Sequence, residues 1–421
     1  MDQHPVRLLV HDDLRRQRLT VFFRLLLALP HYVWAALWTI AVIFVAVASW
    51  GATLSQGRTP DSLHGFLARY VRYLTHLHAY LLLVADPYPG FSGDAGTYPV
   101  DLHIDPPAPQ HRGKTAARIV LVVPAALVSS ALIDASGPSW GRWSSRNELS
   151  ETGAAWLVAF LAWFACLARG RMPRGLRDLE AYSLRYAAQT WAYLLLLTER
   201  YPDARPADPP AAPPDEQHPV ALEVQDDLER SRVTVFFRLL LALPHLVWLV
   251  LWAIVALPVS IAAWVLTLVR AQLPAPLHRF FSAFLRYQAH LYAFLGLIAN
   301  PFPGFTGTPG SYPVELHLPL EPEVQSRWTT LGRGLLVLPA WLISSALGGA
   351  AVVAAILGWF ASLATGRMPR GLRDLGAWWI RYDGQANAYA LFLTERYPYA
   401  GPYEFAEPPE PDVAVEELAA A

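Results

Sequence analysis

The decapeptide Gly366-Arg367-Met368-Pro369-Arg370-Gly371-Leu372-Arg373-Asp374-Leu375 occurs twice in the chain without change, because the same ten residues stand at Gly170–Leu179. Each copy follows a long apolar run and leads into a basic, aromatic segment. That segment ends in Leu-Thr-Glu-Arg-Tyr-Pro, at Leu197–Pro202 in one copy and at Leu393–Pro398 in the other. Such internal repetition indicates a fold assembled from duplicated units.

Two looser versions of the motif begin near Gly57 and Gln272, so the chain divides into four related quarters. Every quarter has an arginine six residues before a proline near its start, and a later Arg-Tyr pair whose tyrosine precedes another proline by sixteen residues. The early arginines are Arg24, Arg118, Arg238 and Arg333, and the pairs are Arg72-Tyr73, Arg185-Tyr186, Arg286-Tyr287 and Arg381-Tyr382. We therefore expect four membrane repeat units, at residues 1–105, 106–201, 218–318 and 319–403.

The composition indicates a membrane protein, since 54% of the residues are hydrophobic, only 16% are charged, and the apolar runs are long enough to cross a bilayer. The formal net charge of −1 favours no nucleic-acid partner. The single cysteine, Cys166, excludes internal disulfides and cysteine-based metal sites. The acidic start, with Asp2, Asp12 and Asp13, lacks the basic region of a signal peptide, so we expect the first apolar run to be retained.

Each apolar run covers about 35–38 residues, or roughly 54 Å as one helix, against ~30 Å of hydrocarbon. A polar insertion at residues 134–151 divides the second run, and such a segment is tolerated only where water reaches it. The sequence therefore predicts helical hairpins, with a turn near Gly348-Gly349 in the fourth quarter. The corresponding regions around Leu37 to Ile40 and Leu251 to Ile254 are apolar, so those two hairpins are predicted to be shallow re-entrant wedges.

If every run is a hairpin, only Arg142 and Arg146 of the 33 basic residues lie on the far side, which places both termini in the cytoplasm of a multi-pass protein of the plasma membrane. The closing helix of each quarter, which contains the Arg-Tyr pair, is amphipathic and is predicted to lie at the membrane interface. The alternative is that it crosses the membrane as a return span.

Short segments with alternating apolar residues lie between the units, for example Val6-Leu8-Val10 and Val100-Leu102-Ile104. With their counterparts in the second half, they predict four strands that form one small extramembrane sheet. Residues 202–217 are predicted to be a Pro-rich linker, and residues 404–421 an acidic disordered tail. The expected fold class is a mainly α, polytopic helical membrane protein.

Three groups of residues carry a resemblance to a known family: Phe22-Phe23-Arg24 with Leu29-Pro30-His31, the Gly-Arg-Met-Pro-Arg-Gly motif, and an Arg-Tyr helix that ends in Tyr-Pro. Together they resemble domain-of-unknown-function family 4389, whose members are bacterial membrane proteins that usually carry tandem copies, as in actinobacteria. The resemblance covers most of residues 1–403, and the insertion in the first half is the main departure. It implies an integral membrane protein and supplies no activity, ligand or catalytic residue.

The repeated arginines are the main candidates for a site. The Arg-Tyr pairs are predicted to bind an anion or lipid headgroups, and the alternative is that their arginines only snorkel to the interface and set helix depth. Arginines of the Gly-Arg-Met-Pro loops, Arg171, Arg174, Arg367 and Arg370, are further candidates for headgroup contact because they precede helix N-termini. Arg24, Arg118, Arg238 and Arg333 are predicted to be structural anchors that pair with Asp86, Glu199 or Glu395; Asn300 stands where the third quarter would carry the acid.

The histidines His4, His103, His218 and His317 lie at the strand segments, but they lack the close spacing of metal ligands, so we expect no metal and no cofactor. The chain contains none of the nucleophile, phosphate-loop or His-Glu-x-x-His motifs of common enzymes, and no catalytic residue is predicted. The sequence therefore predicts a non-catalytic membrane scaffold that interacts with anionic lipids and with an unknown partner protein. The alternative is a transporter or channel for an anion or lipid, lined by the Arg-Tyr pairs.

Overall fold

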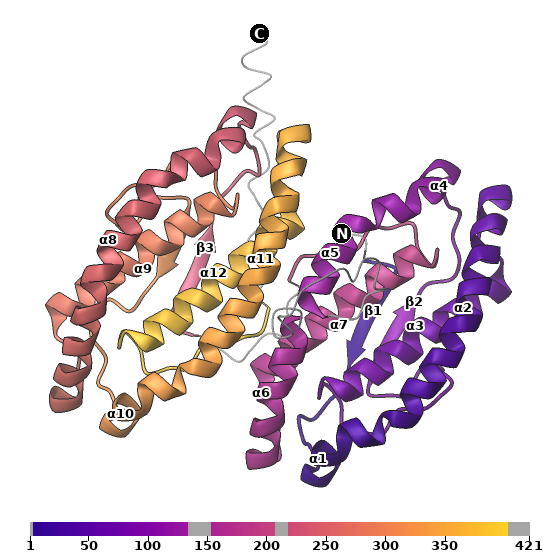
Figure 1. The fold of residues 1–421 in the computed structure, drawn as a ribbon, viewed down its shortest axis with the longest axis horizontal. Coiled ribbons are helices and arrows are strands. Elements are labelled where there is room, and N and C mark those ends of the chain that lie inside the picture. Colours follow the sequence, from indigo (N-terminus) through magenta and orange to yellow (C-terminus); the bar gives the residue numbers. More distant parts are fainter. Residues whose placement is uncertain (1–2, 134–152, 207–217, 403–421) are drawn as a thin grey trace, which may run out of the picture. The chain divides into compact units, whose positions relative to one another are not determined.

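The computed structural model describes residues 3–133, 153–206 and 218–402, which form two compact units. Unit 1 is built mainly from residues 1–204 and unit 2 mainly from residues 205–399 (Figure 1). The predicted insertion at 134–151, most of the predicted linker at 202–217 and the predicted tail at 404–421 lie outside the described residues, as do Arg142 and Arg146.

The described residues are mainly helical, and the two units follow the same order except that α8 stands where unit 1 has α1 and α2, and α11 stands where it has α5 and α6. Unit 1 contains β1 (Val6–Val10), α1 (Arg18–Leu27), α2 (Leu29–Gln56), α3 (Asp61–Leu81), β2 (Val100–Ile104), α4 (Arg112–Leu121), α5 (Val123–Leu132), α6 (Ala154–Arg169) and α7 (Arg174–Leu194). Unit 2 contains β3 (Ala221–Val224), α8 (Arg232–Arg270), α9 (Ala275–Leu295), β4 (Val314–His317), α10 (Arg327–Leu336), α11 (Leu338–Thr365) and α12 (Arg370–Ala390).

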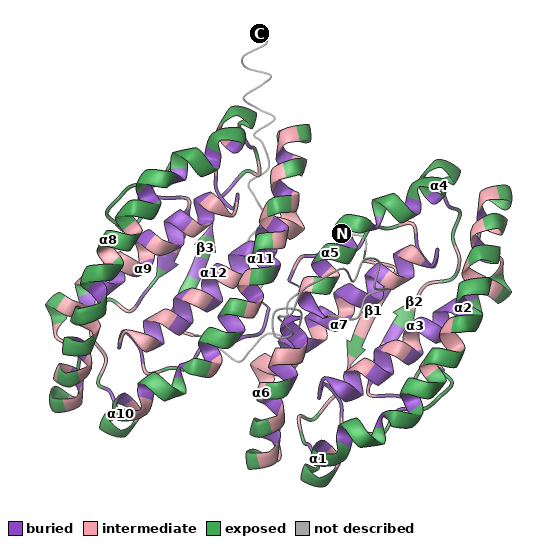
Figure 2. Cartoon of the chain, in the orientation of Figure 1, coloured by how far each residue is buried: buried purple, intermediate pink, exposed green. Residues whose placement is uncertain are grey.

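The closing helices, α3, α7, α9 and α12, form the centre of the units. In unit 1, α3 contacts β2 and α2, whereas α7 contacts β1, α5 and α6. In unit 2, α9 contacts β4 and α8, and α12 contacts β3 and α11. Figure 2 shows the result: the closing helices are largely buried, and the apolar helices around them expose much of their surface. The closing helices are therefore interior elements, and their arginines meet protein groups.

The four predicted strands are present, but they form two sheets and not one. β1 pairs with β2 in an antiparallel register that aligns Val6 with Ile104, and β3 pairs with β4 with Ala221 opposite His317. Each strand thus pairs with the other strand of its own unit. The prediction of a single sheet was wrong because it assumed that all four strands share one surface.

The prediction of hairpins is also wrong for three of the runs. α2 is continuous through Leu37 to Ile40, α8 is a single helix of 39 residues, and α11 continues through Gly348-Gly349. Gly348 serves helix packing, because a Cβ there would lie 3.1 Å from the indole nitrogen of Trp379. A glycine inside a helix is roughly 1 kcal/mol less favourable than alanine, and the close contact with Trp379 offsets this cost.

Three described helices, α2, α8 and α11, are long and apolar enough to cross a membrane. The helices α4 and α5, which are bent by 42° at their junction, are long and apolar enough only when they are taken together. Arg18 begins α1 and Arg58 follows α2, so basic residues stand at both ends of this continuous apolar run. The prediction that nearly all basic residues and both termini lie on one side of the membrane depended on hairpins, and the continuous helices do not support it.

The repeated motif defines where the apolar helices end. Gly57, Gly170 and Gly366 follow α2, α6 and α11 with φ of 75°, 66° and 76°, a left-handed conformation that glycine adopts without steric cost. A proline directly precedes all four closing helices, at Pro60, Pro173, Pro274 and Pro369. The Gly-Arg-Met-Pro motif is therefore a helix stop followed by a helix start.

The continuity of α11 can be tested with spin labels at Leu342 and Ile356, both about half exposed, in a Cys166→Ala background. The 14 intervening steps predict about 21 Å between the two Cα atoms at 1.5 Å per residue. A hairpin that turns at Gly348-Gly349 would bring the two labels side by side, roughly 10 Å apart. Pulsed electron paramagnetic resonance distances distinguish the two, and a short distance would contradict the continuous helix.

Candidate functional site

Each quarter contains a deeply buried arginine at the same position, six residues before a proline, and these four side chains are a regular polar feature of the described structure. Arg24, Arg118, Arg238 and Arg333 are only 3%, 1%, 2% and 1% exposed. They lie in α1, α4, the first turns of α8, and α10. A guanidinium group buried in this way requires acceptors for its N–H groups, since an unpaired buried charge is strongly destabilising.

The acceptors are backbone carbonyls at the C-terminus of the closing helix of the same quarter. Arg118 donates to the carbonyls of Tyr193 (3.1 Å) and Thr198 (2.8 Å), and Arg333 donates to those of Tyr389 (2.9 Å) and Thr394 (3.2 Å). Arg24 and Arg238 bind the corresponding pairs, Tyr80 with Ala85 and Phe294 with Ala299. The last carbonyls of a helix lack intrahelical donors and carry the negative end of its dipole, so a cation satisfies both.

The turn that presents these carbonyls is strained at a non-glycine residue in every quarter. Leu83, Leu196, Leu297 and Phe392 have φ between 60° and 63°. A left-handed conformation costs such residues roughly 1–2 kcal/mol. An aromatic ring also covers each guanidinium group, at 4.3 Å for Arg24 over Tyr80 and at 4.1 Å for Arg118 over Tyr193. Arginine and turn thus form one unit that joins an apolar run to its closing helix.

The predicted acidic partners behave differently from one another. Arg24 pairs with Asp86 at 2.8 Å, as predicted. Arg118 instead donates a hydrogen bond from its second terminal nitrogen to the side-chain oxygen of Gln110 at 2.8 Å. Glu199 accepts a hydrogen bond from the backbone N–H of His111 at 3.2 Å. Glu395 likewise accepts the N–H of Ser326 at 3.1 Å, which is the residue before α10. Glu199 and Glu395 thus cap the N-termini of α4 and α10, the first helices of their own quarters, where negative charge is favoured.

The arginines of the Arg-Tyr pairs occupy four separate positions, each beside protein groups. Arg72 donates to the carbonyls of Leu102 (3.0 Å) and Gly93 (3.2 Å) and lies 3.5 Å from Asp101 on β2. Arg286 lies 3.2 Å from Glu315 on β4. Burial alone would raise the pKa of Asp101, but hydrogen bonds from the Gly96 amide, His76 and the Leu102 amide lower it overall.

The other two arginines contact the chain that follows their helices or their own helix. Arg381 donates to the Tyr399 carbonyl at 3.4 Å, and the Arg185 guanidinium lies 5.2 Å from the ring centre of Tyr182. The tyrosines of the pairs are all buried. Tyr73 and Tyr287 lie within hydrogen-bonding distance of the rings of His31 and His245, each at 3.0 Å. Headgroup binding at the Arg-Tyr pairs stays a prediction.

The Gly-Arg-Met-Pro loop of each unit pairs with the segment before that unit's first apolar helix. In unit 2 the Arg230 amide donates to the Gly366 carbonyl and the Met368 amide donates to the Leu228 carbonyl, both near 2.8–2.9 Å. The second pairing repeats in unit 1, where the Met172 amide donates to Leu14. Arg171 and Arg367 are exposed, whereas Arg174 and Arg370 stand half-buried at the starts of α7 and α12.

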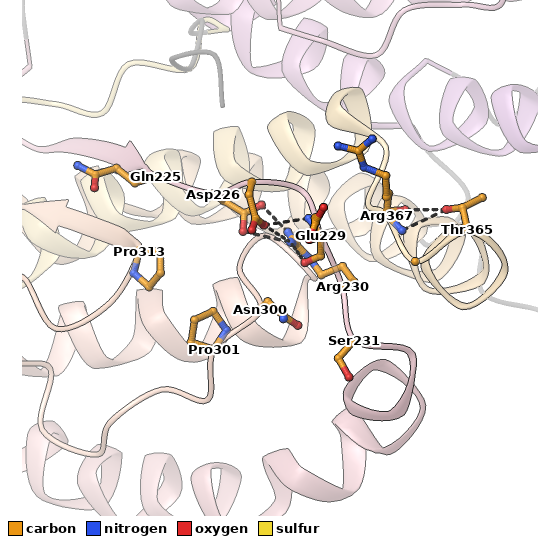
Figure 3. Close-up of a pocket in the computed structure, with 12 residues that line it drawn as sticks. Gln225, Asp226, Glu229, Arg230, Ser231, Asn300, Pro301, Pro313, Thr365 and Arg367 are labelled. Atoms are coloured by element: carbon orange, nitrogen blue, oxygen red, sulfur yellow. Dashed lines mark hydrogen bonds and ion pairs between the residues drawn. The ribbon is translucent and has the colours of Figure 1, made fainter. Parts of the chain in front are cut away.

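A cavity of about 910 Å³ lies beside this loop in unit 2 (Figure 3). Its wall contains the Asp226–Arg230 ion pair at 2.6 Å, and Arg230 also donates to the carbonyls of Leu297 and Ile298. Asn300 lines the same cavity, at the position where unit 1 has Asp86. Figure 3 shows Arg230 turned toward Asp226, so its charge is neutralised inside the protein.

The histidines at the strands do not converge. His4 and His218 accept hydrogen bonds from the amides of Val6 and Val220, and His103 and His317 lie beside Asp105 and Glu223. Within the described ranges, no three His, Cys, Asp or Glu side chains form a group that could hold a metal.

Sequence reasoning missed two contacts that recur in every quarter. Trp50, Trp163, Trp264 and Trp359 each donate an indole N–H to a backbone carbonyl of the neighbouring quarter's first helix, at Thr115, Val21, Thr330 and Val235. Arg18, Arg112, Arg232 and Arg327 each donate to a carbonyl near the end of the neighbouring quarter's apolar helix, at Ala168, Ser55, Ala364 and Val269. The available signal was a constant offset: each tryptophan stands seven residues before the left-handed residue that ends its apolar helix, and each arginine stands six residues before the buried arginine of its quarter.

Glu180 was also missed. This α7 carboxylate is completely buried, and neither oxygen has a hydrogen-bond partner among the described residues. Burial raises its pKa well above the usual range for a glutamate. In the fourth quarter the same position is Gly376.

The role of the acid beside the buried arginine can be tested by exchanging the two units' residues. Asp86→Asn should lower the melting temperature, with a loss of about 1–3 kcal/mol expected when a charge-assisted bond to a buried arginine is removed. Asn300→Asp should raise it, because the second terminal nitrogen of Arg238, which donates to the neutral amide oxygen of Asn300 at 3.4 Å, would then meet a carboxylate. The exposed Asp105→Asn is the control. If both exchanges shift the melting temperature in the same direction, the account of this pair is wrong.

Glu180 predicts a particular pH dependence. Below the unfolded pKa of about 4.3 the carboxyl group is protonated in both the folded and the unfolded chain, so it adds no pH dependence. As the pH rises from there toward the raised folded pKa, the unfolded chain ionises more readily than the folded one, and the free energy of unfolding falls. Glu180→Gln should therefore match the wild type near pH 4–5 and exceed its melting temperature increasingly toward pH 8. A difference that does not change with pH would show that ionisation of Glu180 is irrelevant to stability.

Comparison with known proteins gives a family and nothing more specific. The model of the Domain of unknown function (DUF4389) family matches four stretches of the chain, at residues 18–92, 151–204, 232–306 and 327–400. No curated protein and no solved structure matches. Each matched stretch contains one apolar run, or its latter part, together with the closing helix that follows. Because these stretches cover more than half of the chain, the protein belongs to the DUF4389 family, with four tandem matches.

Proposed function

We propose that this chain is a polytopic integral membrane protein of four repeated units that acts as a non-catalytic, lipid-interacting scaffold. The observation that supports it best is the exposure of the apolar helices. In the most apolar part of α2 and of α8 only 11% of the residues are buried inside the protein. Their exposed side chains include Phe44 at 71% and Leu239 at 74%. Apolar surface of this extent on helices of this length favours an acyl-chain environment.

The charge distribution along these helices fits the same proposal. Between Arg232 and Arg270, the ends of α8, the buried Arg238 is the only Asp, Glu, Lys or Arg residue. α2 and α11 contain no Asp, Glu, Lys or Arg. At 28 residues each, they are about 42 Å long, which matches a bilayer with its headgroup regions.

The exposed arginines that bind the ends of the apolar helices support contact with anionic headgroups. Arg18 and Arg112 in unit 1, and Arg232 and Arg327 in unit 2, each use one nitrogen on a helix-terminal carbonyl and remain exposed. They therefore present positive charge where uncharged helix gives way to polar loop. Arginine at this level anchors membrane proteins and attracts anionic lipid.

A scaffold is favoured over a transporter because the Arg-Tyr pairs, which would line a transport path, bind protein groups inside each quarter. Arg72 and Arg286 lie against acidic residues of the strands, and Tyr73 and Tyr287 are fixed to histidines of the apolar helices. A site for a transported anion would need such donors to be available to it.

Headgroup contact can be tested in unit 1 with the double variant Arg18→Gln/Arg112→Gln. Added phosphatidylglycerol should raise the melting temperature of the wild type in neutral detergent, because a ligand that binds the native state stabilises it. The variant should lose part of this rise, at about 1 kcal/mol per arginine.

The matched control is Arg7→Gln/Arg69→Gln. It removes the same charge from partly exposed arginines on β1 and α3, away from the ends of the apolar helices. It should keep the full effect of phosphatidylglycerol. An equal loss in both double variants would mean that only net charge matters, and no loss in either would remove the proposed headgroup role.

A further inference from the structure

α11 and α12 together form a cavity of about 440 Å³ in unit 2. Trp341, Ser345, Gly348 and Val352 line it from one face of α11, at helical spacing. Trp379 and Asp383 line it from α12, one turn apart. Trp341 is 42% exposed and Val352 is 59% exposed, so the cavity opens on the side where α11 presents its apolar surface.

Asp383 is the only acidic or basic residue among those that line this cavity. Its carboxylate accepts hydrogen bonds from the Ser344 hydroxyl at 2.7 Å and from the Asn387 amide at 2.9 Å. Both donors are neutral, so neither balances the charge of the ionised carboxylate. Burial raises the pKa of Asp383, which means that ionisation at this site is unfavourable until a cation arrives.

The two tryptophans are held in place by their own hydrogen bonds. The indole N–H of Trp341 donates to the Asn387 side chain at 3.1 Å, and that of Trp379 donates to the Ser344 carbonyl at 3.0 Å. Trp379 is also stacked on Tyr292, with 5.1 Å between ring centres. A Cβ at position 348 would approach the Trp379 ring at 3.1 Å, so Gly348 makes room for it. The site is therefore pre-organised by its supporting contacts.

This combination occurs in the fourth quarter alone. By the spacing of the Arg-Tyr pairs, the positions equivalent to Asp383 are Leu74, Ala187 and Gln288, and those equivalent to Trp341 are Tyr32, Ala126 and Leu246. The family fold therefore does not require a carboxylate beside two indoles. Its presence in one quarter points to a ligand and not to a general structural need.

We propose that this cavity binds an organic ammonium group, with Asp383 as its counter-ion and with Trp341 and Trp379 as aromatic walls. Indole rings attract ammonium ions through cation–π interactions, and a carboxylate supplies the opposite charge. Two sources share this chemistry: the headgroup of an aminolipid that enters from the bilayer, and a free organic amine. The site does not depend on the headgroup contacts of the exposed arginines proposed above.

The free-amine arm of the test is a calorimetric titration of the full chain in neutral detergent with butyltrimethylammonium chloride. The lipid arm is native mass spectrometry, which counts the phosphatidylcholine and phosphatidylglycerol molecules retained by each chain. Binding that depends on Asp383 supports the proposal in either experiment. Such binding in the titration identifies a free organic amine as the ligand, and such binding in the mass spectra identifies a lipid headgroup.

Asp383→Asn removes the charge and keeps the shape: its amide oxygen can still accept from Asn387, and its amide N–H can donate to the Ser344 hydroxyl oxygen. It should weaken ammonium binding at least tenfold without changing the retention of phosphatidylglycerol. Glu321→Gln, an exposed acid of the same unit, removes the same charge and should have no effect. Trp341→Leu provides a second variant at a partly exposed position and should weaken binding several-fold. The proposal is overturned if neither probe binds, or if Asp383→Asn and Trp341→Leu bind as the wild type does.

Discussion

The fold depends on a buried guanidinium group at the C-terminus of each closing helix. The apolar helices expose much of their surface, and in the proposed membrane environment packing that surface on a closing helix gains little, because lipid tails are as apolar as the side chains of the helix. The arginine supplies a specific contact, because its buried guanidinium group donates to carbonyls at and just after the C-terminus of the closing helix, where the helix dipole is negative. Arg24, Arg118, Arg238 and Arg333 make this contact in all four quarters.

The rest of the architecture follows from that contact. The closing helices are fixed beneath the apolar helices, so their polar faces meet the strands, where Arg72 and Arg286 find acidic partners. Contacts between neighbouring quarters then close each unit: a tryptophan such as Trp50 reaches across to the carbonyl of Thr115, and Trp163 reaches back to that of Val21. The apolar helices provide most of the exposed apolar surface and the closing helices are largely buried, which supports the proposed membrane role.

The sequence predicted the parts of this structure that depend on spacing, and failed where packing overrides local signals. The tandem copies, the period-two strands and the positions of the repeated arginines could be read directly, because each rests on residues at fixed intervals, whereas the burial of Arg24, Arg118, Arg238 and Arg333 could not. The continuity of α11 through Gly348-Gly349 could not be predicted, because a glycine pair favours a turn. Only the position of Trp379 shows that Gly348 allows close helix packing. The partners of Arg118 were also out of reach, because Gln110 and Glu199 compete for one guanidinium group and only geometry decides between them.

The most direct test of the account is labelling of the membrane-embedded protein with a photoactivated, lipid-soluble carbene reagent, followed by mapping of the modified residues. The account predicts modification of exposed positions such as Phe44, Leu239 and Phe360 on α2, α8 and α11. It predicts little modification of the closing helices, whose residues such as Leu67 and Phe281 are fully buried. Strong labelling of α3, α7, α9 or α12, with the outer helices spared, would contradict it.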